Sequence, residues 1–419
     1  MVVSMVCAMA QEPSPPDALQ SLIATATANN QELASWRTRS LEAKGLLRQA
    51  GVKTPFTVEA STSSGRPLKT VGEEEYSAGF SRTLETGGKR GRRVAVAEVR
   101  LNQVEKEYLE RLRLFAFEIK SRYADALGES LRLKIFDDVI AANRRSLELT
   151  QARVAQGDAA QLDQTLLEVE LARVEALKST AGGRLNAALS DLRRLAALPT
   201  DSNVLGTTIF RLGPQAAQLE SLIPVALEAR ADLRVAKLME QLGEEELRLV
   251  EAEGRPDVTV AARYFKRNSQ FDDQYGTTPT GSSVLLRDRD DILQVGVSVP
   301  ILTKKRNAGN VEAAQARIVG ARQRARFLEK AIPQEVEAAW KRWTASRESS
   351  SILESSVVSQ SQKTLAIIQQ AYQLGQLRVL DVLNEQRRVL DARFALLDSQ
   401  IDGAKSFAEL ERAVGGDIQ

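Results

Sequence analysis

The segment from Gly157 to Asp163 reads GDAAQLD, and the segment from Gly375 to Asp381 reads GQLRVLD. Each lies in the middle of a long stretch whose apolar residues recur at helical spacing. The two glycines are separated by the same 218 residues as the two aspartates. Because a glycine interrupts each helical stretch at the same place, each segment predicts two helices joined by a tight turn.

Further pairs of similar segments surround these two turns. The alternating segment YSAGFS at 76–81 precedes the first pair of helices, and LQVGVS at 293–298 precedes the second. Leu33 matches Leu233 at a shorter offset of 200 residues. Three paired segments in the same order predict an internal duplication, which decides the architecture before any other feature.

The composition excludes several classes of protein. The 419 residues carry 57 basic and 55 acidic side chains, and this balance does not indicate nucleic-acid binding. The chain has no histidine and a single cysteine, so it lacks the commonest general base, the commonest metal ligand and any disulfide framework. We therefore expect no enzyme activity, no cofactor and no metal site.

The N-terminus carries the only targeting signal. Residues 1–10 are apolar and end in Ala8-Met9-Ala10, a pattern typical of signal-peptide cleavage. We expect a signal-peptide remnant there, with a lipid-modified Cys7 or an unstructured N-terminus as alternatives. The sequence contains no run of 18 or more apolar residues, so it predicts no transmembrane helix.

The order of patterns along the chain predicts two similar halves. The predicted parts are a signal-peptide remnant at 1–10, a first repeat at 11–200, a linker at 201–216, a second repeat at 217–415 and a tail at 416–419. The predicted helices are 18–50, 92–156, 160–198, 219–253, 309–374 and 379–414, and the predicted strands are 55–64, 76–85, 257–266 and 292–301. Residues 267–290 are expected to form a polar loop, and Pro333 to mark a kink or joint between helices.

Each predicted strand has one apolar and one polar face. The apolar faces are Phe56, Val58 and Ala60; Tyr76, Ala78 and Phe80; Val258, Val260, Ala262 and Tyr264; and Leu293, Val295, Val297, Val299 and Ile301. Strands of about ten residues cross an outer membrane at a tilt. Four strands cannot close a barrel alone, and an open sheet edge in hydrocarbon leaves its amides unsatisfied. Strands in a membrane therefore require several chains to share a barrel, and three chains supply twelve strands.

A small soluble sheet that caps a helical bundle is the alternative. The proline-free stretch 92–156 disfavours it, because a helix of that length extends about 98 Å. Such a helix does not fold back onto a compact globule. It requires a long bundle, a coiled coil or an oligomeric helical barrel.

With these motifs identified, the sequence resembles the outer membrane factor family, the TolC-like exit ducts of tripartite efflux pumps and type I secretion. The resemblance extends from about residue 18 to residue 415. It rests on the helix-turn motifs ARVAQGDAAQLDQTLLEVELARVEA and AYQLGQLRVLDVLNEQRRVLDAR and on the strand-to-helix runs FSRTLETGGKRGRRVAVAEVR and VSVPILTKKRNAGNVEAAQAR. The strings TLETGGKRGRR and KKRNAGN are most similar to the heavy-metal branch, the cobalt-zinc-cadmium and copper-silver pumps.

The resemblance implies a mainly α-helical protein with a transmembrane β part. Three identical chains, each with two internal repeats, would form a long α-helical barrel and a 12-stranded β-barrel. The implied location is the outer membrane of a Gram-negative-type cell, in contact with its lipid and with most of the mass in the periplasm. The implied partners are a periplasmic adaptor (membrane fusion) protein and a proton-driven inner membrane transporter of the resistance-nodulation-division type.

The implied function is a passive exit duct for heavy-metal cations. A duct for type I secretion or drug efflux is an alternative, and a soluble coiled-coil scaffold is an alternative of a different class. The resemblance places the periplasmic aperture at Asp163, Tyr372 and Asp381. It places the helix-turn tips and the adaptor-docking surface at Gly157, Leu162, Gly375, Leu377, Val379 and Leu380.

These residues also have local explanations. Asp163 and Asp381 are typical of the first turn of a helix, where the helix dipole favours a negative charge. Both glycines are typical of a tight turn between helices, and the leucines are typical of an apolar helix stripe. Leu377 stands where some family members have an arginine that ties the closed state. Threefold symmetry would turn each aspartate into a ring of carboxylates, which favours cations.

Overall fold

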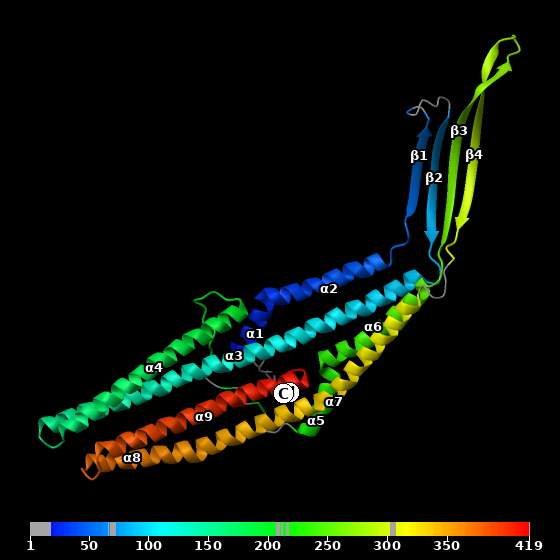
Figure 1. Cartoon of the computed structure of the whole chain (residues 1–419). Helices are drawn as coiled ribbons and strands as arrows, with labels where there is room; N and C mark the ends of the chain where they lie inside the picture. The colour runs from blue at the N-terminus through cyan, green and yellow to red at the C-terminus, as the bar shows by residue number, and fades with distance from the viewer. Residues whose placement is uncertain are drawn as a thin grey trace, which may run out of the picture. The chain divides into compact units, whose positions relative to one another are not determined.

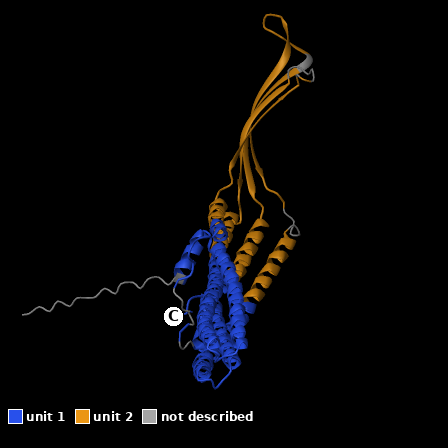
Figure 2. Ribbon diagram, turned by 90° about the vertical axis from the view of Figure 1, so that its left-hand side faces the viewer, with its two compact units in different colours: residues 1–38, 106–234, 326–419 blue, residues 39–105, 235–325 orange. Residues whose placement is uncertain are grey.

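The computed structural model describes residues 18–65, 67, 73–206, 210, 213–214, 218–301 and 307–418. The expected signal-peptide remnant at 1–10, part of the expected linker at 201–216 and Gln419 lie outside these residues. The chain forms two compact units (Figure 2). One holds the described residues within 1–38, 106–234 and 326–419, and the other holds those within 39–105 and 235–325. Each unit therefore combines segments from both expected repeats.

The helices are long and follow the same order in both halves of the chain (Figure 1). They are α1 (Ala18–Asn29), α2 (Gln31–Ala50), α3 (Lys89–Ala155), α4 (Gln161–Ala196), α5 (Leu219–Ala229), α6 (Ala231–Glu253), α7 (Ala308–Ile352), α8 (Ser359–Gln373) and α9 (Val379–Val414). A π-helix, Leu353–Val358, joins α7 to α8. Helix α3 has 67 residues and extends about 100 Å.

Two helices expected to be continuous are each broken once. The helix expected at 18–50 stops after Asn29 and restarts at Gln31, because the Asn30 carboxamide caps the second piece by accepting a hydrogen bond from the Leu33 N–H at 3.1 Å. The Asn30 amide also donates to the Leu195 carbonyl at 3.1 Å. The helix expected at 219–253 is also broken once. The break is at Arg230, whose extended backbone ends α5.

The helix expected at 309–374 departs from the prediction in another place. Helix α7 continues through Pro333, so the expected joint between helices at that residue is wrong. The helical geometry changes instead at the π-helix Leu353–Val358, where backbone hydrogen bonds join residues five apart instead of four. The sequence there is rich in serine, which signals no particular helix type.

The core of the helical unit consists of separate apolar clusters between its helices. One cluster joins α1, α2, α3 and α4 and consists of Leu22, Ala26, Leu33, Phe115, Ile119, Tyr123, Ala126, Leu127, Leu192, Ala196 and Val204. A second cluster includes Phe136, Val174 and Ala181. At Gly128 a side chain would overlap Ile401, so glycine allows α9 to approach α3 closely. Small residues at such crossings let long helices pack side by side.

The other unit contains a four-stranded antiparallel sheet in the order β1-β2-β3-β4 (Figure 1). The strands are β1 (Phe56–Ser64), β2 (Glu74–Leu84), β3 (Val258–Thr277) and β4 (Ser283–Ser298). The pairing of β2 with β3 joins the hairpin of the first half to that of the second. Strands β1 and β4 are the two edges of this sheet.

The expected polar loop at 267–290 is wrong. Strands β3 and β4 continue through most of it and leave a short turn, in which the Thr278 N–H donates to the Ser282 carbonyl at 2.9 Å. Opposite charges face each other across the two strands, as at the pair Arg267 and Asp290. Such cross-strand pairs stabilise a strand that lacks apolar alternation, so polarity alone misled the prediction.

Candidate functional site

The first helix turn is built around Gly157. Its φ of 80° lies in the left-handed region. The Gly157 N–H donates to the Val154 carbonyl at 3.0 Å, and the Asp158 N–H donates to the Arg153 carbonyl at 2.8 Å. These two bonds form a Schellman motif, which satisfies the last carbonyls of α3. A glycine is needed here for its backbone conformation, since an added Cβ would meet no atom within 4 Å.

The second turn repeats this geometry at Gly375, whose φ is 75°. The Gly375 N–H donates to the Tyr372 carbonyl at 3.0 Å, and the Gln376 N–H donates to the Ala371 carbonyl at 2.9 Å. An added Cβ at Gly375 would again meet no atom within 4 Å. The two turns therefore share one hydrogen-bond pattern, as their equal spacing in the sequence suggests.

The two aspartates that follow the turns differ in their local roles. The Asp381 carboxylate accepts a hydrogen bond from the Arg378 N–H at 3.0 Å and so caps the start of α9. Asp163 occupies the same position in α4, but its carboxylate has no hydrogen bond or ion pair within the described part of the chain. Asp381 is exposed and Asp163 is half-buried. Helix capping thus accounts for one aspartate and leaves the other free for a separate role.

Tyr372 is buried within the chain. Its hydroxyl lies 3.0 Å from the Thr150 hydroxyl, and Thr150 is fully buried in α3. The Arg153 guanidinium stacks over the Tyr372 ring at 5.4 Å from its centroid. Tyr372 also belongs to an apolar cluster with Leu167, Val379, Val382 and Leu383. These contacts tie the helix pair α3–α4 to the pair α8–α9 close to both turns.

The apolar residues expected to dock a partner fall into two groups. Leu162 is 66% exposed, Leu380 47% and Leu377 37%, so all three present apolar surface beside the turns. Val379 is only 1% exposed and lies in the apolar cluster around Tyr372. The exposed surface of the chain therefore includes the three leucines but not Val379.

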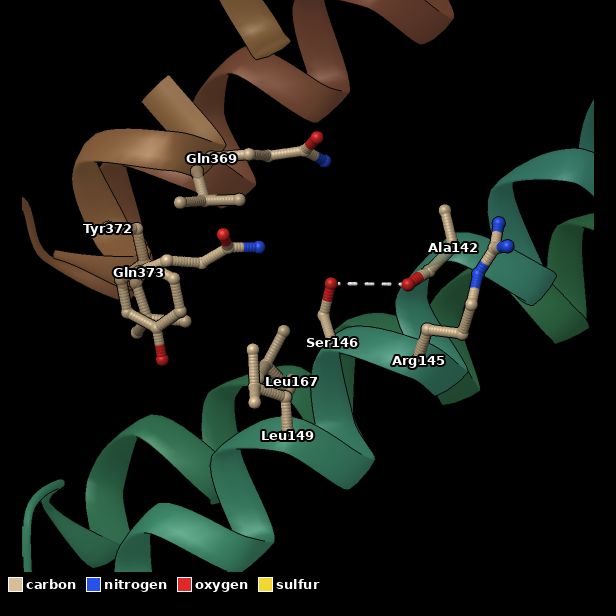
Figure 3. A pocket seen from close by; sticks show the side chains of 10 residues that line it. Ala142, Arg145, Ser146, Leu149, Leu167, Gln369, Tyr372 and Gln373 are labelled. Carbon is tan, nitrogen blue, oxygen red and sulfur yellow. Dashed lines mark hydrogen bonds between the residues drawn. The ribbon is translucent and has the colours of Figure 1, made fainter. Parts of the chain in front are cut away.

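A cavity of about 350 Å³ lies beside the same cluster (Figure 3). Gln369 and Gln373 from α8 face Ser146 of α3 across it, and Leu149 and Leu167 form its apolar side (Figure 3). The Ser146 hydroxyl donates to the Ala142 carbonyl at 3.1 Å. The cavity is a mixed polar and apolar recess between the two helix pairs, and sequence patterns gave no signal for it.

A buried carboxylate connects α4 to α9 further along the helices. The Glu170 side chain is buried and accepts hydrogen bonds from Arg387 at 2.6 Å and from Arg173 at 3.3 Å. The hydrogen bond to Glu170 raises the pKa of the Arg387 guanidinium above its ordinary value. This ion pair was not predicted, because an Arg and a Glu far apart on two helices carry no motif.

The register of the sheet brings the four predicted apolar faces together. Val58 pairs with Phe80, Phe80 with Ala262, and Ala262 with Val295. Since side chains alternate between faces, the rows two residues away lie on the same side. The exposed apolar residues on this side are Phe56, Val58, Tyr76, Phe80, Leu84, Val260, Tyr264, Leu293, Val295 and Val297.

The opposite face of the sheet is mostly polar, with the register pair Phe265 and Ile292 as its apolar exception. The hydroxyls of Ser61 and Ser77 lie 2.7 Å apart, and those of Thr83 and Thr259 lie 3.0 Å apart. Arg263 forms an ion pair with Glu59 on the same side. One side of the sheet thus satisfies its polar groups internally, while the other offers a broad apolar surface that no described residue covers.

The junction between the sheet and α3 is held by a second unpredicted ion pair. The Lys89 ammonium is buried, donates to the Arg255 carbonyl at 2.7 Å and lies 2.8 Å from the Asp257 carboxylate. Burial alone would raise the pKa of Asp257, but the hydrogen bonds from Lys89 and the Thr86 N–H and the Lys89 charge lower it below its ordinary value. The basic run at 87–93 therefore acts in part as an internal anchor.

Other kinds of site receive no support from the described residues. They contain no group of three or more His, Cys, Asp or Glu side chains arranged to hold a metal ion. No described helix is long and apolar enough to cross a membrane.

Part of the chain matches a known protein family. Residues 222–416 match the family model described as Outer membrane efflux protein. This match begins within α5 and ends at the two glycines that follow α9. It covers nearly all of the second expected repeat. The second half of the chain is therefore similar to this family.

Two curated relatives have related sequences. Outer membrane protein TolC of Vibrio cholerae serotype O1 is 22% identical over 320 residues, an alignment that covers 76% of this chain and 72% of the relative. Outer membrane efflux protein BepC of Brucella suis biovar 1 is 23% identical over 282 residues, which covers 66% of this chain and 58% of the relative. Both alignments extend beyond the segment matched by the family model.

Solved structures show the same fold. Outer membrane protein VceC from Vibrio cholerae superposes with a TM-score of 0.73 at 20% identity and covers 95% of this chain and 96% of that chain. CusC gives 0.72 at 18% identity, with 98% and 96% covered. The open state of the MtrE outer membrane channel of Neisseria gonorrhoeae gives 0.74 at 17% identity, with 95% and 89% covered. The mainly helical fold with a sheet is thus that of outer membrane channels.

Proposed function

We propose that this chain is the outer membrane channel subunit of a tripartite efflux pump and acts as a passive exit duct. The observation that carries this proposal is the four-stranded sheet, whose apolar face is exposed and whose polar face is satisfied internally. A soluble protein rarely leaves an apolar patch of this extent uncovered. The family match and the related folds support the same conclusion.

Three copies complete the membrane part of the duct. Strands β1 and β4 have unpaired edges, which cannot lie in hydrocarbon because their amides would go unsatisfied. When β4 of one copy pairs with β1 of the next, three copies close a barrel of twelve strands. The helices of the three copies then form a long periplasmic barrel, with most of the mass in the periplasm.

The helix turns form the periplasmic end of this duct. Three copies of Asp163 and three of Asp381 make two rings of carboxylates, which favour the passage of cations. Tyr372 belongs to the same aperture and acts by holding α8 against α3 through Thr150. A periplasmic adaptor docks on the apolar residues beside the turns, and its binding biases the helix pairs toward an open arrangement.

Heavy-metal cations are the proposed cargo, supplied by a proton-driven transporter of the resistance-nodulation-division type. The support is the similarity of the strings TLETGGKRGRR and KKRNAGN to the heavy-metal branch. A hollow duct makes few selective contacts, so the pump selects the cargo. Loss of the gene should then sensitise cells to divalent metal salts; sensitivity to drugs alone, or loss of a secreted protein, would assign the duct to drug efflux or type I secretion.

The function is tested first by fractionation and conductance. We expect the protein to extract from membranes only with detergent and to migrate as a trimer. In planar bilayers, the double variant Asp163→Ala/Asp381→Ala should raise the leak conductance and reduce cation preference. Glu354→Ala, an exposed acid in the π-helix, serves as the control and should change neither.

Two results would contradict this proposal at different levels. A monodisperse monomer that needs no detergent would exclude the channel and favour a soluble coiled-coil scaffold. A trimeric channel whose conductance is unchanged by the double variant would keep the duct but remove both aspartates from its gate.

A further inference from the structure

The apolar face of the sheet carries one arginine. Arg82 of β2 pairs in register with Phe56 of β1 and with Val260 of β3, and Val260 pairs with Val297 of β4. This row lies two residues along the strands from the row that contains Phe80 and Val295. Rows two residues apart share a face, so Arg82 is on the apolar face. A permanent charge on a surface that faces lipid has a high free-energy cost and requires a partner.

Within the described residues, the Arg82 guanidinium has a ring contact but no anion. It lies over the Phe56 ring at 4.5 Å from the centroid, and its Nε is buried without a hydrogen-bond partner. Arginines on the polar face are paired instead, Arg263 with Glu59 and Arg267 with Glu75. Arg82 is therefore an oriented, positively charged donor without an acceptor in the described part of this chain.

The position of Arg82 along the strand suggests where the acceptor comes from. It lies two residues before Leu84, the last residue of β2, and so close to the point where the chain enters α3. At the other end of the same face, the pair Lys266 and Asp291 marks the return of charged residues. Arg82 thus lies at the boundary of the apolar band on the side of the helices, where lipid headgroups begin.

We propose that Arg82 and Phe56 form a binding site for the phosphate headgroup of a phospholipid in the leaflet nearer the helices. The planar guanidinium donates two parallel hydrogen bonds to phosphate oxygens. The exposed Phe56 ring packs against the upper acyl chain and holds the guanidinium in place. This inference rests on the proposed function, because it requires the sheet to be in a membrane.

The test counts phospholipids retained by the purified trimer. Wild-type protein, exchanged into detergent with added phosphatidylglycerol, should hold one tightly bound phospholipid per chain in native mass spectrometry. Arg82→Gln should reduce this retention at least tenfold. Arg82→Lys keeps the charge but loses the paired hydrogen bonds, and it should reduce lipid retention partially. Phe56→Leu should also reduce lipid retention partially. These two variants replace Arg82→Gln in the test if Arg82→Gln fails to fold. The control Arg263→Gln removes an arginine from the polar face and should retain the lipid.

Three outcomes would overturn the site. Equal lipid retention by wild-type protein and Arg82→Gln would show that Arg82 does not bind the headgroup. Displacement of the lipid by inorganic phosphate alone would show an anion site rather than a lipid site. Dissociation of Arg82→Gln trimers with unchanged lipid would assign Arg82 to a carboxylate of an adjacent copy. Failure of the wild-type protein to form detergent-extracted trimers would instead contradict the proposed function itself.

Discussion

At the scale of single residues, equivalent side chains in the two halves of the chain make different contacts. Asp163 and Asp381 occupy equivalent places after two similar turns, yet only Asp381 caps its helix. Tyr372 was expected from the family resemblance, but its hydroxyl contact with Thr150 joins two helices more than 200 residues apart in the chain. Long-range pairs of this kind depend on how helices pack, which periodicity does not encode.

The Lys89–Asp257 pair predicts how stability depends on pH. The pKa of Asp257 lies below its ordinary value of 3.8 in the folded chain. Its contribution to stability is therefore complete above about pH 4 and is lost as the pH falls through the lowered pKa. Asp257→Asn should lower the free energy of unfolding by about 3 kcal/mol at pH 6, because it leaves Lys89 buried without a counter-charge.

Calorimetric unfolding from pH 6 down to pH 2.5 measures this difference. The gap between wild-type protein and Asp257→Asn should narrow as the pH falls, since protonation removes the same charge from the wild type. Asp158→Asn, in an exposed turn, is the control and should not change stability. A gap that stays constant over this range would show that the carboxylate charge contributes nothing at the junction.

At the scale of elements, the two helix turns depend on backbone conformation alone. Gly157→Ala and Gly375→Ala should each destabilise the helical unit by about 1–2 kcal/mol, the cost of a left-handed conformation for a residue with a Cβ. Gly183→Ala in α4 is the matched control, because an added Cβ there also meets no atom within 4 Å but φ is not positive. It should stabilise the helix by about 0.5–1 kcal/mol.

Thermal unfolding followed by circular dichroism distinguishes these variants. Equal effects of all three alanines would mean that the turns do not depend on glycine. A loss at Gly157 without a loss at Gly375 would mean that the two turns tolerate strain differently, despite their common hydrogen-bond pattern.

The elements also show how far sequence patterns reach. Apolar alternation identified the four strands, and glycine marked both helix turns, because each pattern has a direct physical cause. The ends of β3 and β4 escaped detection, since their residues are polar and lack apolar alternation; Arg267, for example, lies opposite Asp290 in register and forms an ion pair with Glu75 of β2. The helix breaks at Asn30 and Arg230 escaped it as well, because each depends on side-chain contacts with a distant helix.

At the scale of the whole molecule, the two faces of the sheet must meet different environments. Val295, which is 69% exposed on the apolar face, should not tolerate a charge. Val295→Lys should cost about 2–4 kcal/mol in a membrane-embedded barrel and should reduce the amount of heat-resistant trimer recovered from outer membranes. The variant Ser298→Lys places the same charge on the polar face, opposite the uncharged Thr259, and should assemble normally. Equal assembly of both variants would contradict the assignment of the apolar face to lipid.

The two hairpins differ in length, and this difference would decide which residues lie furthest from the cell surface. Strand β3 continues to Thr277, nine residues beyond Asn268, its last pair with β2, so the second hairpin extends about 30 Å beyond the paired strands of the first. Around a ring of three copies, long and short hairpins would alternate and form three stiff fingers with open notches between them. Antibodies and proteases would first meet the uncharged turn between β3 and β4, while small solutes leaving the duct would pass sideways between the long hairpins.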